Sequence, residues 1–124
     1  MGLYVVRTGK DAGDIYFEDV TACTVYVWKP SSHQATLVAE NLLAPTMVAV
    51  DEANNLLYIY ANGVVIVDLA TGNKYSVAGI SQQPHGWSVA QGSGKVIYVG
   101  FRAVKSFETT CPQNYLKKRG LCAS

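Results

Sequence analysis

A pattern of short apolar runs recurs about every forty residues along the chain, and no other feature constrains the fold as strongly. Tyr58 lies in the run Leu-Leu-Tyr-Ile-Tyr, and Tyr16 and Tyr98 occupy the same place in similar runs 42 residues earlier and 40 residues later. The segments that begin at Thr24 and Val64 also correspond. Turn residues separate the runs, so each unit reads as about four short antiparallel strands.

The unit between residues 45 and 79 shows this organisation most clearly. Its apolar runs cover 47–50, 56–60, 64–69 and 75–78, and Asn62-Gly63 separates the second from the third. Asn-Gly between two β-branched runs predicts a tight hairpin, because a type I′ turn needs positive φ at both central positions. We therefore expect a four-stranded antiparallel meander here.

A period near forty with four short strands per unit is typical of β-propeller blades. The sequence predicts an all-β fold of about three four-stranded antiparallel blades that form part of a six-bladed propeller. The predicted units span about residues 3–41, 44–80 and 83–107, all within 1–108, and the third unit lacks a fourth strand. Residues 109–124 lose the pattern and are expected to form an irregular, cysteine-containing tail. The alternative is a compact β-barrel or sandwich whose hairpins look alike.

Three blades are too few to close a ring, since closed propellers contain about four to eight. An open arc of three blades leaves two apolar faces uncovered. We therefore expect a partner to complete the propeller. This partner is either a second copy, which would give a homodimer with six blades, or another chain or segment of a longer propeller.

Composition excludes two classes of partner. The chain of 124 residues has a net charge of +1, which gives no electrostatic basis for binding nucleic acid or an anionic membrane. No apolar run approaches the roughly 20 residues that span a bilayer. Hydrophobic residues make up 49% of the chain, as expected for a folded domain with a core.

The stretch from Pro45 to Tyr60, Pro-Thr-Met-Val-Ala-Val-Asp-Glu-Ala-Asn-Asn-Leu-Leu-Tyr-Ile-Tyr, resembles the opening of a blade in six-bladed propellers of the NHL, YWTD and SMP-30/gluconolactonase type. In those propellers a proline precedes the inner strand, an acidic residue ends it, and an aromatic residue lies in the second strand. The resemblance is one of repeat style and covers most of residues 3–107. The first unit lacks the proline, and the third has Ala90 where the second has Asp51.

Resemblance to the SMP-30 type implies a metal-dependent hydrolase with a divalent cation on the channel axis. Such a cation needs several converging oxygen ligands. The expected inner strands begin near Leu3, Thr46 and His85, and none has a carboxylate there. We therefore expect no metal or other cofactor, and the hydrolase is kept as an alternative in which a partner chain supplies the ligands.

The sequence contains no recognisable catalytic constellation. No Gly-x-Ser-x-Gly elbow is present, and no Ser/His/Asp spacing can be argued from it. His33 lies in a polar turn and is expected to be solvated. His85 begins an expected inner strand, where it either faces the channel or bonds to the backbone of its turn. No catalytic residue is assigned, so the sequence favours a non-enzymatic function while leaving an enzyme open.

A binding site uses other residues of the inner strands. Arg7, Thr46, Met47, His85 and Trp87 fall at or near these strands, and three blades would bring them around one mouth. An apolar and aromatic pocket with a few polar groups is typical of a ligand site. We therefore predict a binding module for a small molecule or a peptide. The alternative is that Met47 and Trp87 pack between blades.

The cysteines give an indication of the compartment. Cys111 and Cys122 bracket a short segment of the tail, and a disulfide between them would suit an extracellular, secreted setting. Cys23 is then left as a buried thiol or a partner for another chain, or it pairs with one of the tail cysteines. The first residues show no signal peptide.

Overall fold

Eleven strands form three antiparallel sheets in the computed structural model, which describes the backbone of residues 2–77, 84–91, 95–100 and 103–108. The first sheet contains β1 (Leu3–Val5), β2 (Ile15–Asp19), β3 (Thr24–Lys29) and β4 (Gln34–Ala39). The second contains β5 (Met47–Asp51), β6 (Leu56–Tyr60), β7 (Val64–Asp68) and β8 (Lys74–Val77). The third contains β9 (Gly86–Ala90), β10 (Lys95–Gly100) and β11 (Ala103–Glu108).

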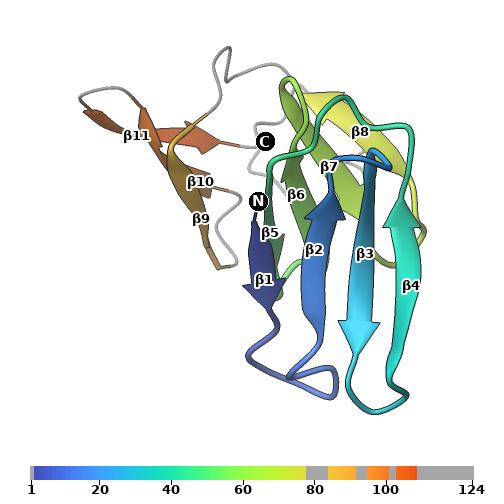
Figure 1. Cartoon of the computed structure of the whole chain (residues 1–124). Helices are drawn as coiled ribbons and strands as arrows, with labels where there is room; N and C mark the ends of the chain where they lie inside the picture. The colour runs from blue at the N-terminus through green and yellow to red at the C-terminus, as the bar shows by residue number, and fades with distance from the viewer. Residues whose placement is uncertain (1, 78–83, 92–94, 101–102, 109–124) are drawn as a thin grey trace.

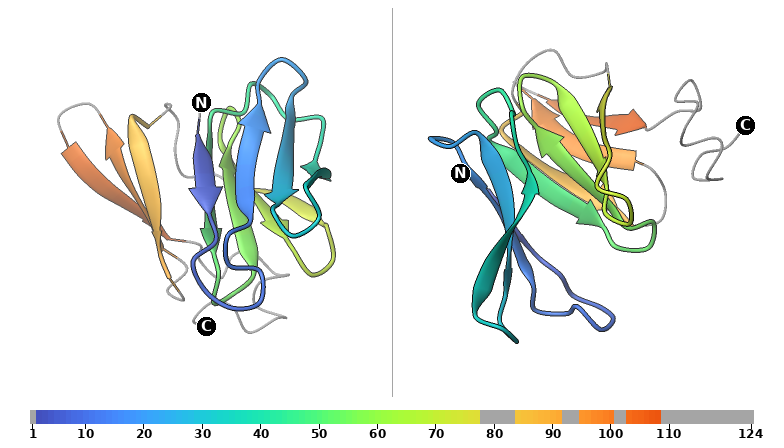
Figure 2. Two further views of the ribbon diagram at one scale, coloured as in Figure 1. Left: turned by 60° about the horizontal axis from the view of Figure 1, so that its bottom comes forward. Right: turned by 90° about the vertical axis from the view of Figure 1, so that its right-hand side faces the viewer.

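Each sheet is a meander in which consecutive strands pair (Figures 1 and 2), and contacts place the second sheet between the other two. Their first strands come together, because β5 contacts both β1 and β9. The predicted all-β fold with blade-like sheets is confirmed, and the single barrel or sandwich is wrong, since the described strands form three separate sheets. Tyr16, Tyr58 and Tyr98 each lie in the second strand of their sheet. Residues 109–124, which include the predicted irregular tail, lie outside the described residues. Within the described part of the chain, no helix is long and apolar enough to cross a membrane.

The middle sheet has a hydrophobic core on both faces, and β6 is buried along its whole length. Tyr58 and its alternate neighbours pack in a cluster with Val89 of β9. Leu57 and Ile59 point the other way and pack in a second cluster with Val25 of the first sheet. Alternate side chains of a strand point to opposite faces, so a continuous apolar run is what a strand between two sheets requires. Burying each large side chain contributes about 1.5–3 kcal/mol.

The turn between β6 and β7 differs in length from the prediction. Asn62 and Gly63 both have positive φ, 55° and 125°, as the Asn-Gly signal predicts. However, Tyr60 pairs with Val64, so the connection has three residues, and Ala61 is buried within it. The Asn-Gly pair therefore predicts where the strands reverse, but it does not predict the length of the loop.

The first inner strand, β1, ends at Val5, and the N–H of Val6 still donates to the Asp14 carbonyl at 2.8 Å. The backbone N–H of Arg7 donates to the Glu52 carboxylate, 3.1 Å away. Thr8 donates to the same carboxylate through its own N–H at 3.0 Å. A side chain of the second sheet thus holds the chain of the first just beyond the end of β1.

Candidate functional site

An open hollow of about 730 Å³ lies where the first strands of the three sheets begin. We call it the mouth hollow. It is lined by Gly2, Leu3, Thr46, Met47, Val48, Pro84, His85, Gly86 and Trp87. Residues from the starts of β1, β5 and β9 therefore share one site, as expected for strands that run in the same direction side by side.

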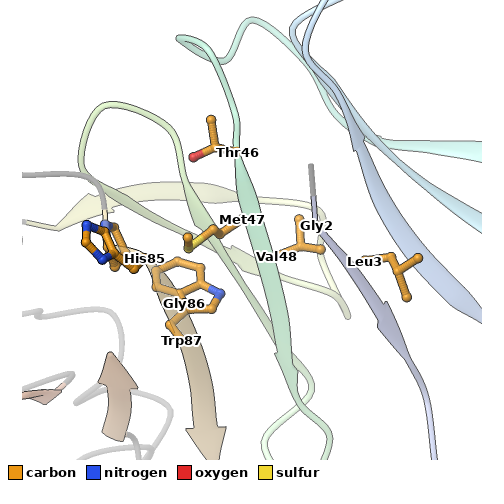
Figure 3. A pocket seen from close by; sticks show the side chains of 9 residues that line it. Gly2, Leu3, Thr46, Met47, Val48, His85, Gly86 and Trp87 are labelled. Atoms are coloured by element: carbon orange, nitrogen blue, oxygen red, sulfur yellow. The ribbon is translucent and has the colours of Figure 1, made fainter. Parts of the chain in front are cut away.

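Four of the predicted site residues, Thr46, Met47, His85 and Trp87, meet at the mouth hollow. Figure 3 shows the side chains of Met47, His85 and Trp87 grouped together, whereas Leu3 points to the other side of β1. The Trp87 ring contacts Tyr60 edge-on, with centroids 6.3 Å apart. Met47 and Trp87 also pack against the core cluster between the second and third sheets, so they serve both the packing and the lining.

Two polar atoms of this lining are buried and have no hydrogen-bond partner among the described residues, namely Oγ1 of Thr46 and Nε1 of Trp87. The Thr46 backbone is fixed, because its N–H donates to the carbonyl of Tyr60 at 2.9 Å. A buried polar group without a partner costs about 1–3 kcal/mol. A side-chain rotation that turns either group towards a bound acceptor would recover part of this cost.

Arg7, the fifth predicted site residue, does not lie at the mouth hollow. Arg7 follows the end of β1, whereas Thr46 and His85 precede the starts of their strands. Because these strands run in the same direction, Arg7 lies at one end of them and Thr46 and His85 lie at the other. Arg7 instead lines a second hollow of about 330 Å³ at the opposite end of the inner strands. This second hollow is lined by Tyr4, Arg7, Thr8, Glu52, Ala53, Ser88, Val89 and Gln91.

Glu52 is the centre of a hydrogen-bond network at the second hollow that sequence patterns did not reveal. Its carboxylate accepts the hydroxyl of Tyr4 and both the hydroxyl and the N–H of Thr8, and its own N–H donates to Gln91 Oε1 at 2.6 Å. The Gln91 amide in turn donates to the Val50 carbonyl at 2.7 Å. Side chains from all three sheets are thus joined at one point.

The network shifts two pKa values in opposite directions. Burial and the neighbouring Glu52 carboxylate raise the pKa of Tyr4 to about 12. Burial alone would raise the pKa of Glu52, but hydrogen bonds from Tyr4, Thr8 and the Arg7 backbone outweigh it and lower the value. Glu52 therefore stays ionised and acts as an anchor between sheets.

Glu18 of β2 also lies close to the mouth hollow, although it is not in an inner strand. The backbone N–H of Gly2 donates to its carboxylate. Glu18 is almost fully buried, and this burial raises its pKa. This contact was not predictable from sequence patterns, because the register of β1 against β2 decides which β2 side chain comes near Gly2.

The described residues do not fit the divalent metal that the SMP-30 resemblance implies. Among them, no three His, Cys, Asp or Glu side chains gather into a group that could hold a metal ion. The Glu18 carboxylate accepts from Gly2 of the lining, and a hard cation needs several oxygen ligands. The donor set in the part of the chain that the structure describes therefore gives the hydrolase no metal site.

Cys23 has a free thiol and a positive φ of 57°, and no disulfide occurs within the described residues. Cys111 and Cys122 lie outside them. The tail disulfide therefore stays a prediction.

The structure is similar to β-propeller chains of known structure. A chain from a nidogen/laminin complex, a YWTD-type propeller, superposes with a TM-score of 0.70 over 86% of this chain at 11% identity. A chain of Kuenenia stuttgartiensis hydrazine synthase gives 0.70 over 87% at 15% identity. A chain of the mitotic checkpoint complex, a WD40 propeller, gives 0.58 over 77% at 18% identity.

This chain spans less than half the length of each of these structures, namely 43%, 32% and 31%. No protein-family model matches the sequence, and no curated protein is detectably similar to it in sequence. At such low identity the likeness establishes the fold, a part of a β-propeller, and function has to be argued from the site.

Proposed function

We propose that this part of a β-propeller is a non-enzymatic binding module that is completed by a partner chain and binds a small molecule or a peptide segment at the mouth hollow. The supporting observation is the hollow itself, to which three neighbouring sheets contribute lining residues. Ligand sites are typically concave and mostly apolar, with a few polar groups that fix orientation.

The lining indicates the chemistry of the ligand. Met47 and Trp87 offer apolar and aromatic surface, while Thr46 and His85 add polar groups at its edge. Among the described residues of the lining, none is Asp, Glu, Lys or Arg. We therefore propose a neutral ligand with an apolar or aromatic group and at least one hydrogen-bond acceptor, as in an aromatic residue of a peptide.

Completion by a partner is supported by the incomplete ring. The described part of the chain contains three sheets, and the propeller chains that it resembles are about two to three times as long. Two of the similar structures are complexes, of nidogen with laminin and of the mitotic checkpoint. Propellers thus occur in protein assemblies, and we propose the same use here.

The binding proposal can be tested by titrating N-acetylphenylalaninamide, a neutral model of an aromatic peptide residue, into the isotopically labelled chain. We expect saturable NMR shifts of the backbone amides of residues 46–48 and 85–87. Thr46→Val removes one hydroxyl with little change of shape and should weaken binding up to about tenfold, the value of one hydrogen bond. Trp87→Phe, which keeps a ring but removes the N–H, should weaken it similarly.

A matched control is Thr36→Val, the same substitution at an exposed position of β4. It should leave the affinity unchanged. The proposal of a ligand site at the mouth hollow is wrong if the wild-type shifts do not saturate, or if Thr46→Val and Thr36→Val bind the probe equally well. The same spectra show whether each variant is folded.

A further inference from the structure

The first sheet carries two apolar rows on the face turned away from the second sheet. Paired residues of an antiparallel sheet share a face. One row runs across three strands, and it consists of Leu3, Phe17 and Tyr26, with Leu37 of β4 beside it. The next row consists of Val5, Ile15 and Trp28. We call these seven residues the outer face.

The strand register of the second sheet repeats these rows. There, Val48, Ile59 and Val65 form one row, and Val50, Leu57 and Val67 form the other. The rows between them match as well, since Tyr4 pairs with Tyr16 as Ala49 pairs with Tyr58. Each outer-face residue of β1, β2 and β3 thus has an equivalent in the second sheet, and every one of these equivalents is apolar.

The two sets of rows differ in what covers them. In the second sheet the two rows belong to the cluster that packs against the first sheet, and Val48 and Val50 are only 6% and 3% exposed. Their equivalents in the first sheet, Leu3 and Val5, are 64% and 42% exposed. Leu37 is 46% exposed. No described sheet lies against the outer face, although its residues occupy the positions that face a neighbouring blade.

The outer face also has internal order that suits a docking surface. The rings of Phe17 and Tyr26 stack with centroids 5.8 Å apart and planes 22° from parallel. Trp28 is held edge-on by His33, with centroids 6.1 Å apart. Aromatic side chains fixed in this way lose little conformational freedom when a partner covers them.

We propose that the outer face binds a second copy of this chain, through the third sheet of that copy. The contact would reproduce the packing that already joins neighbouring sheets within one chain. The first and third sheets lie on either side of the second, so a two-fold arrangement covers both ends of both chains (Figure 2). Two copies supply six sheets, which lies within the range of about four to eight that closes a propeller.

This inference rests on the proposed completion by a partner chain and specifies both the partner and the surface. A second copy is favoured over a smaller partner because a single added sheet would cover the outer face but would not close the ring. It is also favoured by the match of the rows, since the surface that covers Val48 and Val50 inside one chain is itself a propeller sheet.

The test is the mass in solution, measured by light scattering under reducing conditions so that cysteine cross-links do not contribute. The chain has a mass of 13.4 kDa, and we expect about twice this value for the wild type. Leu3→Glu and Leu37→Glu should each return the mass to that of one chain, because both would place a charge inside the contact. Since both side chains are largely exposed in the single chain, these variants should remain folded by circular dichroism.

Matched controls are Val20→Glu and Leu43→Glu, which place the same charge at exposed apolar positions outside the strands. Both should keep the mass of two chains. A wild-type mass of one chain overturns the inference, whatever else covers the outer face. A dimer that survives both Leu3→Glu and Leu37→Glu overturns the docking surface but leaves partner completion standing. Binding at the mouth hollow is judged separately with Leu37→Glu, because Leu3 also lines that hollow.

Discussion

Glu52 shows how much one side chain can do for a fold built of repeated sheets. Its carboxylate accepts hydrogen bonds from Tyr4 and Thr8 of the first sheet, and its backbone holds Gln91 of the third. Core packing between sheets is not directional, whereas this network fixes how the three sheets stand relative to one another. We therefore regard Glu52 as a positioning residue of the whole chain.

The pKa shifts of this network predict a pH dependence of stability. The lowered pKa of Glu52 means that its contribution is complete above the unfolded value of about 4.3 and is lost as the pH falls through the folded value. The raised pKa of Tyr4 means that its contribution is complete below about pH 10 and is lost as the pH rises through about 12.

Glu52→Gln should therefore lower the free energy of unfolding at neutral pH by about 1 kcal/mol, a modest value because the bonds lie near the surface. The difference from wild type should shrink in acid. Urea unfolding at a series of pH values measures both effects. Glu40→Gln changes an exposed glutamate at the end of β4 and is the control. Identical pH profiles for Glu52→Gln and wild type would contradict the anchoring role.

At the scale of the element, β6 is the strand on which the core depends most. Leu57 is fully buried between the first and second sheets. Leu57→Ala should lower the free energy of unfolding by about 2–5 kcal/mol, since it removes apolar contacts and leaves a cavity. Chemical denaturation measures this directly. Leu43→Ala, at a position 66% exposed, should change it by less than about 0.5 kcal/mol. Equal losses in the two variants would show that the middle sheet is not the core.

The strands were largely predictable from sequence, because the physics that makes them is local. Apolar runs bounded by turn residues predicted β6 with its observed bounds and the start of β3 at Thr24. The contact of Arg7 with Glu52 was not predictable, because the two residues lie 45 positions apart in the sequence. The role of Gln91 was not predicted either, because a glutamine in a turn gives no periodic signal.

The mouth hollow was predictable only in part. The structure brings Thr46, Met47, His85 and Trp87 together at one end, because all four stand at the starts of inner strands. Arg7 lies at the other end, because it follows the end of β1, and nearness to a strand does not indicate which end a residue occupies. Glu18 was missed because it comes from a second strand, and pairing register is not visible in a single strand's pattern.

At the scale of the whole molecule, stability should fall from the middle sheet outwards. β6 is hydrogen-bonded on both sides and covered on both faces, whereas β4 ends its sheet and is exposed from Gln34 to Leu37. Amide hydrogen exchange should therefore be at least about a hundredfold slower in β6 than in β4. Exchange measured by NMR residue by residue gives this ratio. Equal protection of β4 and β6 would mean that the chain opens as one unit.

The shared direction of β1, β5 and β9 gives the molecule a front and a back. At the front, where these strands start, the lining includes a threonine, a methionine, a histidine and a tryptophan. At the back, where they finish, it includes an ionised acid beside an arginine, a tyrosine and a glutamine. A ligand that suits the lining of one hollow is therefore chemically unsuited to the other. The central channel of a closed assembly would thus bind different ligands at its two ends.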